Sequence, residues 1–149
     1  MTAMKRILVG LDGSPRTAFV LEQAVALARA QNAKVTLMRA VKVPHELSVE
    51  MRSTWMAFEQ AMFDDATADL ARWGKLVPAD MFDGTAVDIG TPWDAICRKA
   101  TELQASMIVI GSHGYSGLDR LLGTTAGKVV NHADCSVMVV RDPAAATKS

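Results

Sequence analysis

The stretch Ile108-Val109-Ile110-Gly111-Ser112-His113-Gly114 decides the fold of this chain. A short apolar run, Met107 to Ile110, ends abruptly in two glycines that flank a serine and a histidine. Further on, Gly123-Thr124-Thr125-Ala126 opens a segment that we expect to be helical to about His132. Glycines let a backbone approach a ligand closely, and free amides at a helix start favour negative charge. The stretch therefore predicts a loop that holds a phosphate-bearing small molecule, with the two threonine hydroxyls as further donors.

The beginning of the chain repeats this pattern of a strand that ends in glycines. The apolar run Ile7-Leu8-Val9 leads into Gly10-Leu11-Asp12-Gly13, and we expect Ser14 to cap a helix whose first residue is Pro15. The buried face of this helix, which should run to about Gln31, is predicted at Ala18, Leu21, Val25 and Ala28.

The rest of the chain supplies three more strands and two more helices. We expect strands at Val35 to Val41, at Met81 to Ile89 near a sheet edge, and at Ser136 to Val140. Thr91 and Pro92 should start a helix with Asp94 in a structural role. A long helix from Ser48 to about Lys75 carries an apolar stripe, which should pack on the core and, because the helix is so long, in part on a partner subunit. The stripe consists of Met51, Trp55, Phe58, Met62, Ala66, Asp69 with Leu70, and Trp73.

This alternation of strands and helices predicts an α/β fold with a five-stranded parallel sheet and helices on both faces. Such sheets bind ligands at the carboxyl ends of their strands, where the strand order reverses. If the first and fourth strands are neighbours there, both glycine turns face one crevice, and Asp12 lies opposite the phosphate loop.

Composition narrows the class of partner. The chain has 149 residues, with 16 Lys and Arg against 16 Asp and Glu, so no global charge attracts nucleic acid or an anionic membrane. We expect one domain over residues 1–142 and a flexible tail over 143–149. The first apolar run is too short for a signal peptide or a membrane span, and Cys97 and Cys135 have no metal-ligand spacing. These features predict a cytoplasmic protein with reduced thiols.

Several motifs and residues leave their chemistry open. The run Gly123 to Lys128 fails as a Walker A motif, and Gly10-x-x-Gly13 fails as a dinucleotide fingerprint. No catalytic set and no metal-ligand spacing of histidines is evident, and His113 either lines the pocket or packs. Asp12 either closes a turn ahead of Ser14, or binds ribose hydroxyls or a phosphate-bound metal.

The whole chain resembles a single-domain universal stress protein, most strongly over Ile108 to Val140. The ATP-binding branch of that family has a loop of the form G-x2-G-x9-G-[S/T]. Gly111, Gly114, Gly123 and Thr124 match this pattern, although eight residues rather than nine separate the second glycine from the third. The resemblance implies a Rossmann-like domain of the adenine nucleotide alpha hydrolase type, with sheet order 3-2-1-4-5.

The resemblance also implies a set of site residues and partners. Asp12 matches the family aspartate, Ala40 and Val41 lie where adenine is met, and Gly111 and Ser112 lie by ribose and phosphates. Members commonly dimerise through the last strand, here Val137 to Val140. The predicted nucleotide-binding set is Gly10, Leu11, Asp12, Ala40, Val41, Ile110, Gly111, Ser112, His113, Gly114, Gly123, Thr124 and Thr125.

Two functions of different classes remain. The first is a cytoplasmic stress-response protein that binds ATP, alone or with Mg²⁺, and acts as a homodimer on an unknown protein partner. Since neither a base nor an arginine finger is evident, slow hydrolysis at most is expected, and a dedicated enzyme is not. The second is a nucleotide-free dimeric interaction module of the same fold.

Overall fold

Strands and helices alternate throughout the part of the chain that the computed structural model describes, residues 4–42, 48–112 and 123–142. Each strand except the last leads into a helix, as the sequence pattern predicted. In chain order the elements are β1 (Arg6–Gly10), α1 (Thr17–Gln31), β2 (Lys34–Val41), α2 (Val49–Gly74), β3 (Phe82–Ile89), α3 (Pro92–Glu102), β4 (Met107–Gly111), α4 (Thr124–His132) and β5 (Ser136–Val140).

The strands form one five-stranded parallel sheet in the order β3-β2-β1-β4-β5. This confirms the predicted fold class and strand order. β1 pairs with β2 from Arg6 opposite Lys34 and with β4 from Ile7 opposite Met107, so these three strands end close to one level. The order reverses between β1 and β4, which is where α/β sheets of this kind hold ligands.

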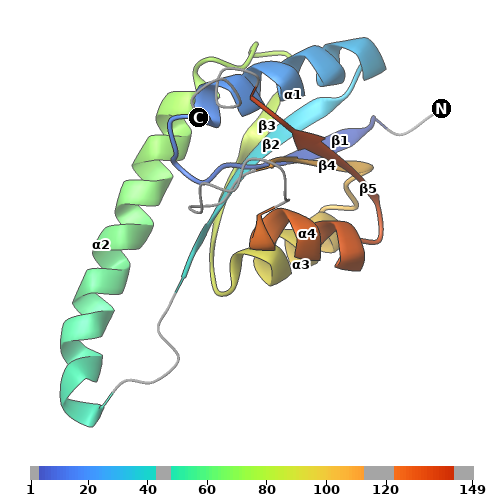
Figure 1. The fold of residues 1–149 in the computed structure, drawn as a ribbon. Helices are drawn as coiled ribbons and strands as arrows, with labels where there is room; N and C mark the ends of the chain where they lie inside the picture. Colours follow the sequence, from blue (N-terminus) through green and yellow to red (C-terminus); the bar gives the residue numbers. More distant parts are fainter. Residues whose placement is uncertain (1–3, 43–47, 113–122, 143–149) are drawn as a thin grey trace.

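Side chains that alternate along the strands divide the core between the two faces of the sheet. Ile7 and Val9 of β1 join a cluster with α1 and the end of α2, whereas Leu8 joins a second cluster with α3 and α4. Figure 1 shows α1 and α2 on one side of the sheet and α3 and α4 on the other. β1 and β4 therefore pass their chains to opposite faces, which opens a gap between the two connections.

Helix α1 begins later than the sequence predicted. Its first residue is Thr17 and its N-cap is Arg16, whereas Ser14 lies in the preceding turn and accepts a hydrogen bond on Oγ from the Arg16 amide at 3.2 Å. The buried face also differs, because Ala18 is exposed and Val20 and Ala24 take its place beside Leu21 and Ala28. Residues 12–16 form a polar turn, so the helix begins after the residues that were expected to form its first turn.

Helix α2 meets the core over its second half only. Ala66 and Leu70 are buried, and Trp73 packs against the cluster on the α1 face. In its first half Met51 and Phe58 are exposed, so the prediction that this part of the stripe packs on the core is wrong. Figure 1 shows the reason, because the first half of α2 projects beyond the sheet. Whether a partner subunit covers that half stays a prediction.

Strand β3 forms one edge of the sheet, as expected from its interrupted pattern. Gly84 has a φ of 92°, and the pairing of β2 with β3 shifts register between Val35 and Leu37. The predicted tail, residues 143–149, lies outside the described residues. Within the described ranges no helix is long and apolar enough to cross a membrane.

The turn between β1 and α1 depends on Gly13. Its φ is 74°, and a Cβ added there would lie 2.9 Å from a guanidinium nitrogen of Arg39. Arg39 is held in that position by Asp69 of α2, whose carboxylate lies 3.2 Å away. Gly13 therefore satisfies a backbone requirement and a packing requirement at once.

Replacing this glycine tests how tightly the turn is specified. We expect Gly13→Ala to lower the free energy of unfolding by about 1–2 kcal/mol, because alanine disfavours positive φ and its methyl group meets Arg39. Gly127→Ala is the matched control. Gly127 lies inside α4, where an added Cβ meets nothing within 4 Å, and there alanine should stabilise the helix by about 0.5–1 kcal/mol. Urea denaturation of both variants measures the two changes, and an equal effect of both would contradict the assignment.

Candidate functional site

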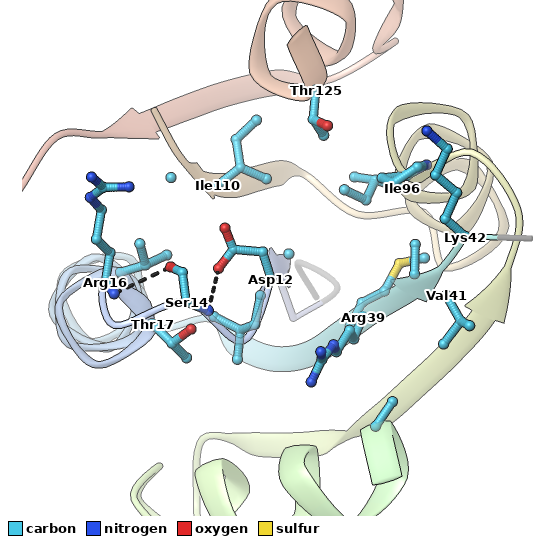
Figure 2. Close-up of a pocket in the computed structure, with 18 of the residues that line it drawn as sticks. Asp12, Ser14, Arg16, Thr17, Arg39, Val41, Lys42, Ile96, Ile110 and Thr125 are labelled. Atoms are coloured by element: carbon cyan, nitrogen blue, oxygen red, sulfur yellow. Dashed lines mark hydrogen bonds between the residues drawn. The ribbon is translucent and has the colours of Figure 1, made fainter. Parts of the chain in front are cut away.

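A cavity of about 420 Å³ opens at the carboxyl ends of β1, β2 and β4. Its volume lies in the range of small-molecule sites. Figure 2 shows Asp12 near its centre, with Ile110 and Thr125 on one side and Arg39 on the side of α2. Eight of the thirteen predicted site residues line it: Gly10, Leu11, Asp12, Ala40, Val41, Ile110, Gly111 and Thr125.

The other five predicted residues fall into two groups. His113 and Gly114 lie outside the described residues. Ser112, Gly123 and Thr124 are described but do not line the cavity. The Ser112 amide donates to the Val140 carbonyl at 2.8 Å, and the Gly123 amide donates to the Ser112 carbonyl at 2.8 Å. The Gly123 amide therefore joins the two described ends of the connection, and the amide of Ser112, which is buried, ties the first of these ends to β5.

The first turn of α4 provides the amides that remain. Gly123 is the N-cap, and its carbonyl already accepts from the Gly127 amide at 2.9 Å. Helix geometry leaves the amides of Thr124, Thr125 and Ala126 without an intrahelical acceptor. Thr125 and Ala126 line the cavity, so this helix end opens onto it. A helix N-terminus that faces a cavity favours a negatively charged group there.

Asp12 closes a turn and also faces the cavity. Its Oδ1 accepts a hydrogen bond from the Ser14 amide at 2.9 Å, which is the turn expected for an aspartate at this position. The residue is exposed and lines the cavity, so its second carboxylate oxygen can meet a ligand. The two roles proposed for Asp12 are thus compatible with each other.

Three cationic side chains line the cavity, and they differ in their partners. Arg39 contacts Asp69 of α2 at 3.2 Å, and Asp69 also contacts Arg72 at 3.0 Å. Among the described residues, no carboxylate forms an ion pair with Arg16 or Lys42. Figure 2 shows these two side chains on opposite sides of Asp12. Arg39 therefore fastens α2 to the sheet, and the other two cations are available to an anionic ligand.

One buried polar group in the cavity wall lacks a partner. Thr17, the first residue of α1, is 2% exposed, and its hydroxyl oxygen has no hydrogen-bond partner among the described residues. A buried hydroxyl left in this state costs about 1–3 kcal/mol. Natural cores contain few such groups.

Sequence reasoning missed the residues that α1, α2 and α3 bring to the cavity. Arg16 and Thr17 follow the first glycine turn directly, so their place after β1 was a usable signal. Met62, Asp65 and Ala66 carried no such signal, because they reach the cavity only through the packing of α2. From α3 the wall includes Ile96, whose Cδ1 would lie 3.2 Å from a Cβ added to Gly10. Gly10 is thus needed for close packing under the cavity floor.

The described residues offer little for catalysis or metal binding. No group of three or more His, Cys, Asp or Glu side chains among them is arranged to hold a metal ion. Cys97 and Cys135 are free, half-buried thiols, as expected. Burial raises the pKa of both thiols, which opposes thiolate formation and a nucleophilic role.

Comparison with known proteins identifies the family of the chain. The model of the universal stress protein family matches residues 4–141. The chain belongs to the universal stress protein family. A universal stress protein of Methanocaldococcus jannaschii is 26% identical over 147 residues, which cover 93% of this chain and 83% of that protein.

Solved structures of universal stress proteins share the fold. The UspA protein of Lactobacillus plantarum superimposes with a TM-score of 0.75 at 25% identity, over 94% of this chain and 100% of that one. A universal stress protein crystallised in complex with cAMP superimposes with a TM-score of 0.67 at 25% identity, over 94% of this chain and 98% of that one. The fold is therefore that of a family in which one solved member was crystallised in complex with cAMP.

Thiol reactivity checks the electrostatic description of the two cysteines. At about pH 8 an ordinary cysteine is partly ionised, so Cys97 and Cys135 should react with a disulfide reagent more slowly than free cysteine does. In urea both should react at the rate of free cysteine. Absorbance during labelling measures the two rates, and a folded-state rate equal to that of free cysteine would contradict the effect of burial.

Proposed function

We propose that this universal stress protein binds ATP in the cavity at the switch point and acts as a regulatory protein. The observation that carries the proposal is the opening of the α4 N-terminus onto a cavity that also holds Asp12 and two cations to which no described residue is ion-paired. The helix N-terminus and the cations can bind the anionic part of a ligand, and Asp12 can bind its hydroxyl groups. The relative crystallised in complex with cAMP supports a nucleotide rather than an apolar ligand.

In this proposal each part of the nucleotide lies at the carboxyl end of a different strand. Adenine lies by Ala40 and Val41 at the end of β2, ribose by Asp12 and Leu11 at the end of β1, and the phosphates by Gly111 and the first turn of α4. Ser112, Gly123 and Thr124 shape the loop, with the Thr124 amide directed to the phosphates. Gly114 is assigned to the loop as the second glycine of the family pattern, and His113 precedes it in the sequence.

In this proposal the site binds the nucleotide but hydrolyses it only slowly. In the alternative role of Asp12, its free carboxylate oxygen binds a Mg²⁺ that accompanies the phosphates instead of a ribose hydroxyl, because Mg²⁺ commonly takes one or two carboxylates beside phosphates. Among the described lining residues no histidine or paired carboxylate lies ready to activate water. Hydrolysis is therefore slow, and occupancy of the site changes the surface that a protein partner meets in the cytoplasm.

A nucleotide-free dimeric module is the second candidate, and one observation favours it. The amides of Ser112 and Gly123 are already used inside the protein, so the loop ends are closed without a ligand. β5 is the other edge of the sheet, and its residues Val137 to Val139 are apolar and half-buried. An edge of this kind is a template for pairing with a second copy. Homodimerisation through Val137 to Val140 belongs to both candidates.

Replacing Asp12 tests the site while preserving its turn. Asp12→Asn keeps an acceptor for the Ser14 amide but removes the charge, and we expect it to weaken ATP binding by about 1–3 kcal/mol. Titration calorimetry with and without Mg²⁺ separates the two roles, because a loss seen only with Mg²⁺ identifies a metal contact and an equal loss identifies ribose. Wild-type protein that binds no adenine nucleotide would leave the interaction module as the function.

A charge on the edge strand tests the dimer. Met138 is half-buried on β5 and packs against the core cluster on the α1 face, so a lysine there loses part of this packing while its long stem lets the ammonium reach solvent. Met138→Lys should give a monomer at concentrations where the wild type is a dimer, because two like charges would meet across the two-fold axis. Light scattering during size-exclusion chromatography measures the mass, and circular dichroism checks the fold. A dimeric variant with unchanged mass would exclude pairing through β5.

A further inference from the structure

Two cations line the cavity without an ion-pair partner among the described residues, and they lie at different ends of it. Lys42 follows β2 directly, and β2 is separated from β4 by β1 in the sheet order. Arg16 is the N-cap of α1, on the other side of Asp12 (Figure 2). The two side chains therefore approach a bound molecule from different sides.

The position of Arg16 follows from a contact one helical turn away. A Cβ added to Gly111, the last residue of β4, would lie 3.4 Å from Cγ2 of Val20. Val20 stands four residues after Arg16, and its amide donates to the Arg16 carbonyl at 3.0 Å. Residues four apart lie one above the other on the same helix face. Arg16 therefore lies one turn nearer the carboxyl edge of the sheet than the contact with Gly111, beside the point where the chain leaves β4.

We infer that Arg16 binds the terminal phosphates of the ligand and selects nucleotides that carry two or three phosphates over monophosphates. This inference rests on the proposed function, which places the phosphates between Gly111 and the α4 N-terminus. Arginine suits this role because its planar group donates two parallel hydrogen bonds to phosphate oxygens. Arg39 is not available for it, because Asp69 and the Gly13 turn hold its guanidinium on the side of α2.

Lys42 has a different effect in the same cavity. Figure 2 shows it on the side of Asp12 opposite Arg16. Its ammonium is a point charge without the paired, planar donors of a guanidinium. A change at Lys42 should therefore alter the preference for ATP over AMP less than a change at Arg16 does.

The experiment compares how much each added phosphate improves binding. Titration calorimetry gives the dissociation constants of adenosine, AMP, ADP and ATP without Mg²⁺ for wild type, Arg16→Gln, Lys42→Gln and Arg52→Gln. Arg52 is exposed on α2, does not line the cavity and controls for net charge. We expect Arg16→Gln to reduce the preference for ATP over AMP about 10-fold or more, the size of a lost charge-assisted contact, with adenosine affinity unchanged. Lys42→Gln and Arg52→Gln should change that preference by less than about threefold, because distant charges are screened.

Each outcome bears on the inference. An unchanged ATP preference in Arg16→Gln, or a larger loss in Lys42→Gln, would overturn the role of Arg16 and leave ATP binding intact. Wild-type protein without nucleotide affinity would overturn the proposed function and this inference together. Arg16→Lys, which keeps the charge but not the paired donors, should retain part of the preference, and circular dichroism checks that each variant folds.

Discussion

The parallel pairing of β1 with β4 is the constraint on which the rest of this structure depends. Because the chain leaves β1 for α1 on one face and approaches α4 on the other, no helix can cover the ends of these two strands. A cavity at that point follows from the topology, whatever residues line it. Gly10 and Gly13 then shape the β1 end of the cavity, the first through close packing with Ile110 and Ile96 and the second through its positive φ.

The charges around the cavity are divided between structure and ligand. Asp69 accepts contacts from Arg39 and Arg72, so one cation of the cavity wall is used to hold α2 against the end of β2. A partly exposed pair of this kind adds little to stability, but it fixes the position of α2, which supplies Met62 and Asp65 to the wall. Arg16 and Lys42 have no such task among the described residues, which leaves their charges for the molecule that enters.

In helix α2 the apolar periodicity of the sequence does not predict how much of the helix packs on the sheet. The stripe from Met51 to Trp73 is continuous in sequence, and a continuous stripe predicts a continuous packed face. The sheet ends before the helix does, so Leu70 is fully buried while Met56 and Phe58 remain exposed. Nothing in the helix sequence encodes the extent of the sheet it packs on. For the same reason, the contribution of Met62 and Ala66 to the cavity became visible only in the folded chain.

The sequence by itself determined the order of the elements, the parallel sheet and most of the strand ends that line the cavity, because apolar runs that stop at glycines are a local signal. Asp12 and Ile110 were found in this way, whereas Ala40 was placed by the resemblance to universal stress proteins. The tertiary structure alone decided which amides are already used, because the Ser112 amide donates to the Val140 carbonyl and the Gly123 amide donates to the Ser112 carbonyl. It also decided which cations have partners, since Asp69 and Arg39 are thirty residues apart and meet only when α2 packs on β2.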